Sequence, residues 1–375
     1  MPETPILDLD QPPPEPPATM VPILIGLAIG AVLAGILILA KVGKMPDWSW
    51  PRANGLLLIP ALYIVIAFHE LGHLIAGKLA GLDIGGISVG PFLFTKSGRN
   101  WVFRFDRHRW LGGFFQPLSP DVDLPINRYA LCVAGGPIAS VVFMLLCWLA
   151  CIQYGSGDRD WIGSLFWVSL LTLLLAVIPI TAGLNKSDSA RLWQLIHHPE
   201  RARAWIAILM IQTEEVDGLR PRDRSPETFQ QMMQADAFGG EFLSCQFLAY
   251  YRYFDEGAET RALDHLENAL AKSDRAGIAL RHALFLEAAS ASAIIRKQAV
   301  QARTWRERAC KLRKPESLDV VDGAIAMCDG RYQEAAQHWE AAQADVERRR
   351  LDSGLIRFAK EKWAEFESIC KAPRL

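Results

Sequence analysis

The chain has 375 residues, enough for two or three domains, and its formal net charge of −1 argues against binding nucleic acid through an overall positive charge. Hydrophobic residues make up 51% of the chain, a high share for a soluble protein; they gather in residues 20–183, whereas most of the charge lies in residues 185–375. The seven cysteines are scattered without a CxxC pair, so we expect no disulfide framework and a reducing compartment for the charged half. The composition predicts a membrane domain followed by a soluble domain.

Residues 1–19 are rich in proline and acidic, and they contain no lysine or arginine. This composition predicts a disordered tail. The positive stretch that begins a cleaved signal peptide is missing, so we do not expect one here.

Four apolar segments follow, each long enough for a membrane-spanning helix. They cover residues 21–40, 55–82, 129–152 and 161–179. We therefore expect a mainly α-helical protein whose membrane-embedded domain covers residues 20–195 and has about four spans.

The loop between the second and third spans, residues 84–118, is rich in aromatic and β-branched residues. Residues 87–94 and 101–105 predict two strands of a β-hairpin, with Ser97-Gly98 as a turn signal between them. Residues 110–115 predict a further strand, in which the paired glycines Gly112 and Gly113 would let another backbone approach closely.

Basic residues predict the orientation of the spans. The loop 83–126 carries five of them, at Lys96, Arg99, Arg104, Arg107 and Arg109. The positive-inside rule then places this loop, and by alternation the carboxy-terminal half, in the cytoplasm. Lys41, Lys44 and Arg52 would lie on the opposite side, which runs against the same rule.

Residues 196–375 predict a cytoplasmic domain of amphipathic helices with weak internal repeats. Short turn-like stretches precede alanine-rich helices three times, and Trp305 and Trp339 are 34 residues apart, the period of a tetratricopeptide repeat. The alternative is an ordinary helical bundle with alanine-rich contacts.

The sequence His69-Glu70-Leu71-Gly72-His73 lies inside the second apolar segment. Residues four apart share one face of a helix, so the two imidazoles can bind one metal ion, while Glu70 beside them can take a proton from a water that the metal activates. The alternative is a pair of buried, hydrogen-bonded histidines. Ionisable residues within a membrane span are costly, which favours a metal site, and zinc is the metal that suits this pattern.

A catalytic zinc site usually has a third protein ligand. Asp188 is the best candidate, because the second and fourth spans both descend toward the cytoplasmic side and bring it to the depth of His73. An equally good interpretation from the residues alone is that Asp188 caps the helix that follows it. His197 and His198 are further candidates for an accessory ligand or a substrate contact.

Taken together, these motifs resemble those of the site-2 protease family of intramembrane zinc metalloproteases. The resemblance rests on His69-Glu70-Leu71-Gly72-His73, Leu111-Gly112-Gly113-Phe114, Ala134-Gly135-Gly136-Pro137-Ile138-Ala139 and Ser187-Asp188-Ser189-Ala190-Arg191, in that order, over about residues 55–193. It implies a core of three helices, one Zn²⁺ bound by His69, His73 and Asp188, and Glu70 as the general acid and base.

The chain departs from the family pattern at three positions. Ser189 stands where the family usually has glycine after the aspartate, and Ser140 and Ala176 stand where it commonly has asparagine. Such asparagines are thought to help hold the substrate backbone or the oxyanion. Ser140 can still donate a hydrogen bond there, so we expect it to contact substrate together with Gly112 and Gly113.

These features predict a zinc metalloendopeptidase of site-2-protease type, which cleaves substrate proteins in or near their membrane-spanning helices. We expect a multi-pass protein of a cell membrane, of bacterial inner-membrane type, with no nucleic acid partner. The helical domain is expected to bind a protein partner or to gate substrate entry. One alternative is a catalytically inactive relative that acts as a membrane scaffold through its helical domain, which the intact Glu70 disfavours. A zinc channel or carrier is disfavoured because no second span repeats the metal motif.

Overall fold

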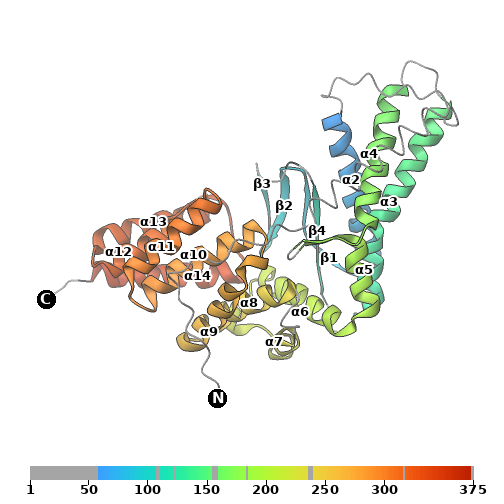
Figure 1. Ribbon diagram of the computed structural model, residues 1–375. Helices are drawn as coiled ribbons and strands as arrows, with labels where there is room; N and C mark the ends of the chain where they lie inside the picture. Colours follow the sequence, from blue (N-terminus) through green and yellow to red (C-terminus); the bar gives the residue numbers. More distant parts are fainter. Residues whose placement is uncertain are drawn as a thin grey trace. The chain divides into compact units, whose positions relative to one another are not determined.

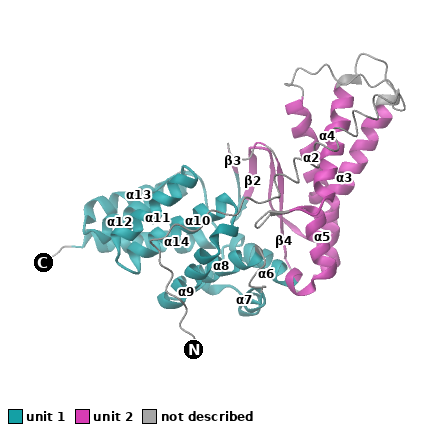
Figure 2. Ribbon diagram, in the orientation of Figure 1, with its two compact units in different colours: residues 1–16, 96–102, 203–375 teal, residues 17–95, 103–202 magenta. Residues whose placement is uncertain are grey.

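The computed structural model describes residues 58–106, 110, 112–120, 124–153, 159–182, 185–234, 240–315 and 317–372. The predicted tail 1–19 and the first predicted span 21–40 lie outside these residues. The described chain is mainly helical and contains a small antiparallel sheet of four strands (Figure 1). It divides into two compact units, one built from residues 17–95 and 103–202 and the other mainly from residues 203–375 (Figure 2).

Three apolar helices form the body of the first unit: α2 (Leu58–Leu79), α3 (Ile126–Gln153) and α4 (Arg159–Val177). Within the described residues, two helical stretches are long and apolar enough to cross a membrane, Leu58–Leu79 and Ile126–Ala150. The apolar part of α4, Trp161–Val177, is shorter. The predicted total of four spans therefore stays a prediction.

Helices α2 and α3 cross at unusually close range. A Cβ atom on Gly72 would overlap the carbonyl oxygen of Gly135 and lie 2.5 Å from the Cβ of Ala139. Small residues at a crossing allow two helix backbones to touch, which is a common way to join helices in a membrane. This contact holds the His69–His73 turn of α2 directly against α3.

The sheet contains β1 (Asp83–Val89), β2 (Phe92–Ser97), β3 (Asn100–Phe105) and β4 (Gly113–Leu118) in the order β3-β2-β1-β4. Strand β1 is antiparallel to both β2 and β4. The predicted turn at Ser97-Gly98 is confirmed, since the chain reverses between β2 and β3 and Gly98 has a φ of 59°.

The prediction of one strand over residues 87–94 is wrong. The chain reverses at Gly90-Pro91, and Val89 pairs with Phe92 across this two-residue loop. Gly90 has a φ of 55°, the left-handed region that a glycine at the first loop position of a hairpin supplies. The predicted strand 110–115 also differs, because β4 begins only at Gly113 and runs on to Leu118.

The second unit is helical. Its elements are α6 (Pro199–Val216), η2 (Pro221–Asp223), α7 (Pro226–Met233), α8 (Gly240–Asp255), α9 (Glu259–Ala271), η3 (Ser273–Arg275), α10 (Ile278–Ile294), α11 (Ala299–Leu312), α12 (Asp319–Cys328), α13 (Tyr332–Arg348) and α14 (Gly354–Lys371). Helix α8 packs with α9, α10 with α11, and α12 with α13, so consecutive helices form hairpins.

These three hairpins share one local design. Each turn contains a residue with positive φ: Gly257, Lys297 and Gly330. Five residues after each turn residue comes a buried alanine, and a second follows seven residues later: Ala262 and Ala269, Ala302 and Ala309, Ala335 and Ala342. The predicted repeats thus coincide with real helix hairpins, and we keep their assignment as tetratricopeptide repeats as a proposal.

Candidate metal centre

Helix α2 presents two different faces. His69, Glu70 and His73 are 8%, 6% and 7% exposed, and they lie on the inner face together with Gly72. Large apolar side chains lie exposed on the outer face, at Ile64, Phe68, Leu71, Ile75 and Leu79. The helix therefore turns its polar motif toward α3 and its apolar face outward, as a membrane helix with a functional interior does.

Asp188 is carried back toward α2 by a closed turn. After α4 the chain forms a short hairpin of β5 (Thr181–Ala182) and β6 (Asn185–Lys186), and α5 (Asp188–His197) then begins. The hydroxyl of Ser187 donates to the carbonyl of Ile178 at 2.7 Å and accepts from the N–H of Ile180 at 2.9 Å. These bonds close the loop and fix the position at which α5 starts.

The interpretation of Asp188 as the helix cap is wrong. Ser187 is the N-cap residue of α5, and its side chain accepts a hydrogen bond from the N–H of Ala190. The carboxylate of Asp188, one residue inside the helix, is therefore available for another partner. A negative charge in the first turn also interacts favourably with the helix dipole.

The side chains of His69, His73 and Asp188 converge. Asp188 Oδ2 lies 3.1 Å from His69 Nε2, Asp188 Oδ1 lies 3.4 Å from His73 Nε2, and the two Nε2 atoms are 3.2 Å apart. Within the described residues, these three form the group of metal-binding side chains that could hold an ion. His197 is not part of it: the ring of His197 lies against that of Trp193, with 3.9 Å between ring centroids and 39° between the ring planes.

The geometry of the group fits a zinc ion. Tetrahedral zinc with bonds of about 2.0–2.1 Å has ligand atoms about 3.3–3.4 Å apart. The two Nε2 atoms are 3.2 Å apart, and each lies 3.1 or 3.4 Å from one of the two carboxylate oxygens of Asp188, so the spacing is close to what zinc needs. The backbone also leaves room for an ion. A Cβ atom on Gly136 of α3 would overlap His73 Nε2 and lie 2.7 Å from His69 Nε2, so glycine keeps this space clear.

Helix α3 also sets which nitrogen of His73 faces the group. His73 Nδ1 lies 2.9 Å from the carbonyl oxygen of Cys132, and a carbonyl can only accept. Nδ1 also lies 3.3 Å from the backbone nitrogen of Gly136, but its contact with the carbonyl oxygen is the shorter one. In a neutral His73 that binds a metal ion through Nε2, the hydrogen would therefore be on Nδ1, and the lone pair of Nε2 would face the ion. A backbone carbonyl is a common outer partner of a metal-binding histidine.

Glu70 lies against the first residue of β4. A Cβ atom on Gly113 would overlap Glu70 Oε1 and lie 2.6 Å from its Cγ atom. The neighbouring Gly112 accepts a hydrogen bond from the N–H of Gly90 at 2.8 Å, which ties this end of β4 to the β1–β2 turn. Of the two glycines predicted to contact substrate, Gly113 thus lies beside the predicted general base.

Asp188 is ionised at neutral pH. Burial alone would raise the pKa of Asp188, but hydrogen bonds to the imidazoles of His69 and His73 outweigh this effect and lower that pKa to about 2. The carboxylate is therefore in the form that binds a metal ion.

Comparison with known proteins agrees with this geometry. The profile of peptidase family M50 matches residues 57–344, which is most of the chain and includes the whole site. The chain belongs to peptidase family M50. The site-2 proteases form this family, so the predicted resemblance is confirmed, and M50 proteins are membrane proteins.

A named protein is also similar to part of the chain. A protein of Nostoc sp. named "Putative zinc metalloprotease" is 29% identical to this M50 protein over 148 residues, which is 35% of this chain and 39% of the relative. The match therefore spans well under two thirds of the relative's length. No solved structure gives a significant match.

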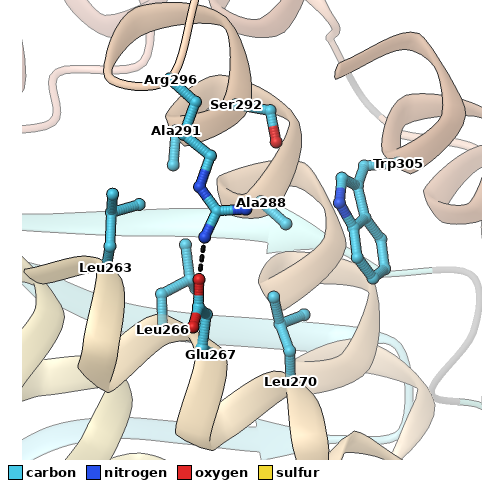
Figure 3. Close-up of a pocket in the computed structure, with 9 residues that line it drawn as sticks. All are labelled: Leu263, Leu266, Glu267, Leu270, Ala288, Ala291, Ser292, Arg296 and Trp305. Carbon is cyan, nitrogen blue, oxygen red and sulfur yellow. Dashed lines mark hydrogen bonds and ion pairs between the residues drawn. The ribbon is translucent and has the colours of Figure 1, made fainter. Parts of the chain in front are cut away.

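The helical unit of this M50 protein contains a small pocket that does not resemble the candidate metal centre. It lies between α9, α10 and α11, with leucine and alanine side chains and Trp305 on its walls (Figure 3). Arg296 forms an ion pair with Glu267 across it. The lining is that of a packing seam between neighbouring helix hairpins, and it contains no histidine, cysteine or aspartate.

Sequence reasoning missed two features of the metal centre. It did not identify Cys132 or Gly136, although Gly136 lies within a motif that carried the resemblance. The predicted contact of Ser140 with substrate stays a prediction; in the structure the Ser140 hydroxyl lies 2.9 Å from His69 Nδ1. Cys132 contributes a backbone carbonyl, which every residue has, and Gly136 contributes only the absence of a side chain. Neither can be recognised from the residue type, so only the packing of α3 on α2 reveals their roles.

Proposed function

We propose that this M50 protein is an intramembrane zinc metalloendopeptidase that cleaves peptide bonds in or near membrane-spanning helices of substrate proteins. The convergence of His69, His73 and Asp188 beside Glu70 carries this proposal. Two imidazoles and one carboxylate are a common protein ligand set for catalytic zinc, and they leave one position open for a reactant.

Each residue of the site would have its own role in hydrolysis. Bound by the three ligands, zinc would supply Lewis-acid chemistry, acidifying water and polarising a peptide carbonyl. Glu70, buried at 6% exposure, would take the proton from the attacking water and then deliver it to the nitrogen of the leaving amine. The close approach of Gly113 to Glu70 supports this role, because a peptide that pairs with the start of β4 would lie next to the base.

We infer that an extended stretch of substrate adds as a strand along the side of β4 that faces away from β1. Among the described strands, β4 lies at the edge of its sheet, and it begins beside Glu70. The N–H of Gly90 donates to the carbonyl of Gly112, so these two residues form a hydrogen-bonded pair. In antiparallel strands, hydrogen-bonded and non-hydrogen-bonded pairs alternate, so the backbone N–H and C=O groups of Gly113 and Phe115 face away from β1. Those groups can pair with a substrate backbone whose helix has unwound.

The decisive experiment uses the full chain in detergent or vesicles. We expect about one zinc ion per chain, and we expect Glu70→Gln to abolish cleavage of a membrane-helix substrate while leaving the bound zinc in place. Glu361→Gln, on α14 of the helical unit, removes one glutamate charge outside the candidate metal centre and serves as the control. Bound zinc with cleavage that Glu70→Gln leaves unchanged would refute the mechanism. Bound zinc with no cleavage by the wild type would favour the inactive scaffold.

The helical unit has a separate proposed role. We propose that it lies in the cytoplasm and binds a protein partner or gates the access of substrate. Its chain of helix hairpins with a shared turn design supports this role, because stacked hairpins present an extended surface for recognition.

A further inference from the structure

Ser140 and His69 form a buried hydrogen bond. Ser140 lies on α3 and is 1% exposed, and its hydroxyl oxygen lies 2.9 Å from His69 Nδ1. Both histidines of the centre are thus bonded through Nδ1 to α3, one to a backbone carbonyl and the other to a hydroxyl. The two partners are not equivalent, because a hydroxyl can also donate.

The direction of this bond decides whether His69 can bind a metal. If Ser140 accepts, the imidazole hydrogen is on Nδ1, and the lone pair of Nε2 faces the ligand group. If Ser140 donates, the hydrogen moves to Nε2 and points at His73 Nε2 and Asp188, 3.2 and 3.1 Å away. Only the first arrangement leaves three ligand atoms facing one point.

A second buried serine supports Ser140. Ser169 on α4 is fully buried, and its hydroxyl donates to the backbone carbonyl of Ser140 at 3.2 Å. This bond joins α4 to α3 at the position that contacts His69. It limits how far Ser140 can move away from the imidazole.

We propose that Ser140 is a positioning residue that holds His69 in the tautomer and orientation needed to bind zinc, rather than a residue that contacts substrate. The proposal rests on the proposed metal centre. The hydroxyl is buried and already bonded to His69, which leaves it poorly placed to meet a peptide. Outer partners of this kind typically change metal affinity by about 10- to 100-fold when they are removed.

The test measures zinc affinity rather than activity. The full chain carrying Glu70→Gln, which removes the proposed base, is titrated with zinc against a chromogenic chelator. We expect Ser140→Ala to weaken zinc binding by about 10- to 100-fold. Ser140→Thr keeps the hydroxyl and should restore most of the affinity. Thr172→Val is the control, because the Thr172 hydroxyl bonds the carbonyl of Val168 within α4.

A spectroscopic measurement separates positioning from general damage. Cobalt bound in place of zinc reports the ligand geometry through its visible absorption, and we expect Ser140→Ala to change this spectrum while Thr172→Val does not. Wild-type affinity and spectrum in Ser140→Ala would overturn the proposal, as would equal losses in Ser140→Ala and Ser140→Thr. If the wild type binds no zinc at all, the proposed function itself fails, which is a different result.

Discussion

At the level of single residues, the metal centre depends on missing side chains as well as on ligands. Gly136 leaves open the space next to His69 and His73, and Gly113 leaves room for the carboxylate of Glu70. Neither glycine has a positive φ, so neither is required by the backbone conformation. The requirement is one of space around the reacting groups.

Gly136→Ala tests this requirement. The added methyl group would overlap His73 Nε2, so we expect the bound zinc to fall from about one ion per chain to nearly none. Alanine is favoured over glycine in a helix by about 1 kcal/mol, so the substitution does not weaken α3 through its helix propensity. Metal analysis of the purified full chain measures the effect.

The matched control is Gly163→Ala on α4, where a Cβ atom meets nothing within 4 Å. It should keep the wild-type zinc content. Full zinc occupancy in Gly136→Ala would show that the ion binds elsewhere, and the assignment of His69 and His73 as ligands would then be wrong.

At the level of secondary structure, β4 connects the sheet to the centre. Its first residue, Gly113, lies against the side chain of Glu70. The ring of Phe115 is nearly parallel to that of His73, with 12° between the ring planes and 6.3 Å between the ring centroids. These contacts support the proposal that a substrate peptide pairs with the outward backbone groups of Gly113 and Phe115 and so lies beside Glu70.

Comparing Phe115→Pro with Phe115→Ala tests substrate binding by strand addition. Both variants lose the ring, but only proline also removes the outward N–H, and it leaves the pairing with β1 intact. We expect cleavage by Phe115→Pro to be about fivefold slower than cleavage by Phe115→Ala, the effect of one hydrogen bond worth ~1 kcal/mol. Both should retain zinc. Equal cleavage rates in the two variants would rule out pairing at this position.

The helix hairpins of the second unit contain a buried acid that makes their stability sensitive to pH. Burial raises the pKa of Glu287 on α10, although the hydroxyls of Tyr250 and Tyr251 donate to its carboxylate and oppose the shift. The folded state therefore binds the proton more tightly than the unfolded state. The stabilisation is complete below the unfolded pKa of about 4.3 and is lost as the pH rises through the higher folded value.

Glu287→Gln removes this titration. We expect the variant to gain thermal stability relative to the wild type as the pH rises from 5 to 8, with both proteins measured as full chains by scanning fluorimetry. Glu307→Gln, on the exposed side of α11, controls for the loss of one charge. A midpoint difference between Glu287→Gln and the wild type that is the same at both pH values would contradict the raised pKa.

At the level of the whole chain, the two units follow the division of composition. The first contains the apolar helices and the metal centre, and the second contains the charged helices. Membership of family M50 makes the chain a membrane protein. The number of spans, the cytoplasmic location of the helical unit and its partner stay proposals, and reactivity of single cysteines placed in residues 83–126 and 196–375 would test the topology.

Local sequence patterns predicted the features that depend on neighbours along the chain. The spacing of His69 and His73 placed both imidazoles on one face of α2, because a helix repeats every 3.6 residues. The turn signals at Gly98, Gly257 and Gly330 marked real reversals, because these glycines adopt a positive φ that most residues avoid. The one failure of this kind was Gly90-Pro91, where a two-residue reversal lay within an apparently continuous β-rich run.

Contacts between distant segments could not be read from the order of residues. Asp188 joins His69 across 119 positions, and from the residues alone a ligand and a helix cap were equally good interpretations of it. The bond between Ser140 and His69 and the space left by Gly136 arise from the close crossing of α2 and α3. Such contacts depend on how helix surfaces fit together in three dimensions, and the fold therefore decided that Asp188 lies beside both histidines, that Ser140 contacts His69 and that β4 begins beside Glu70.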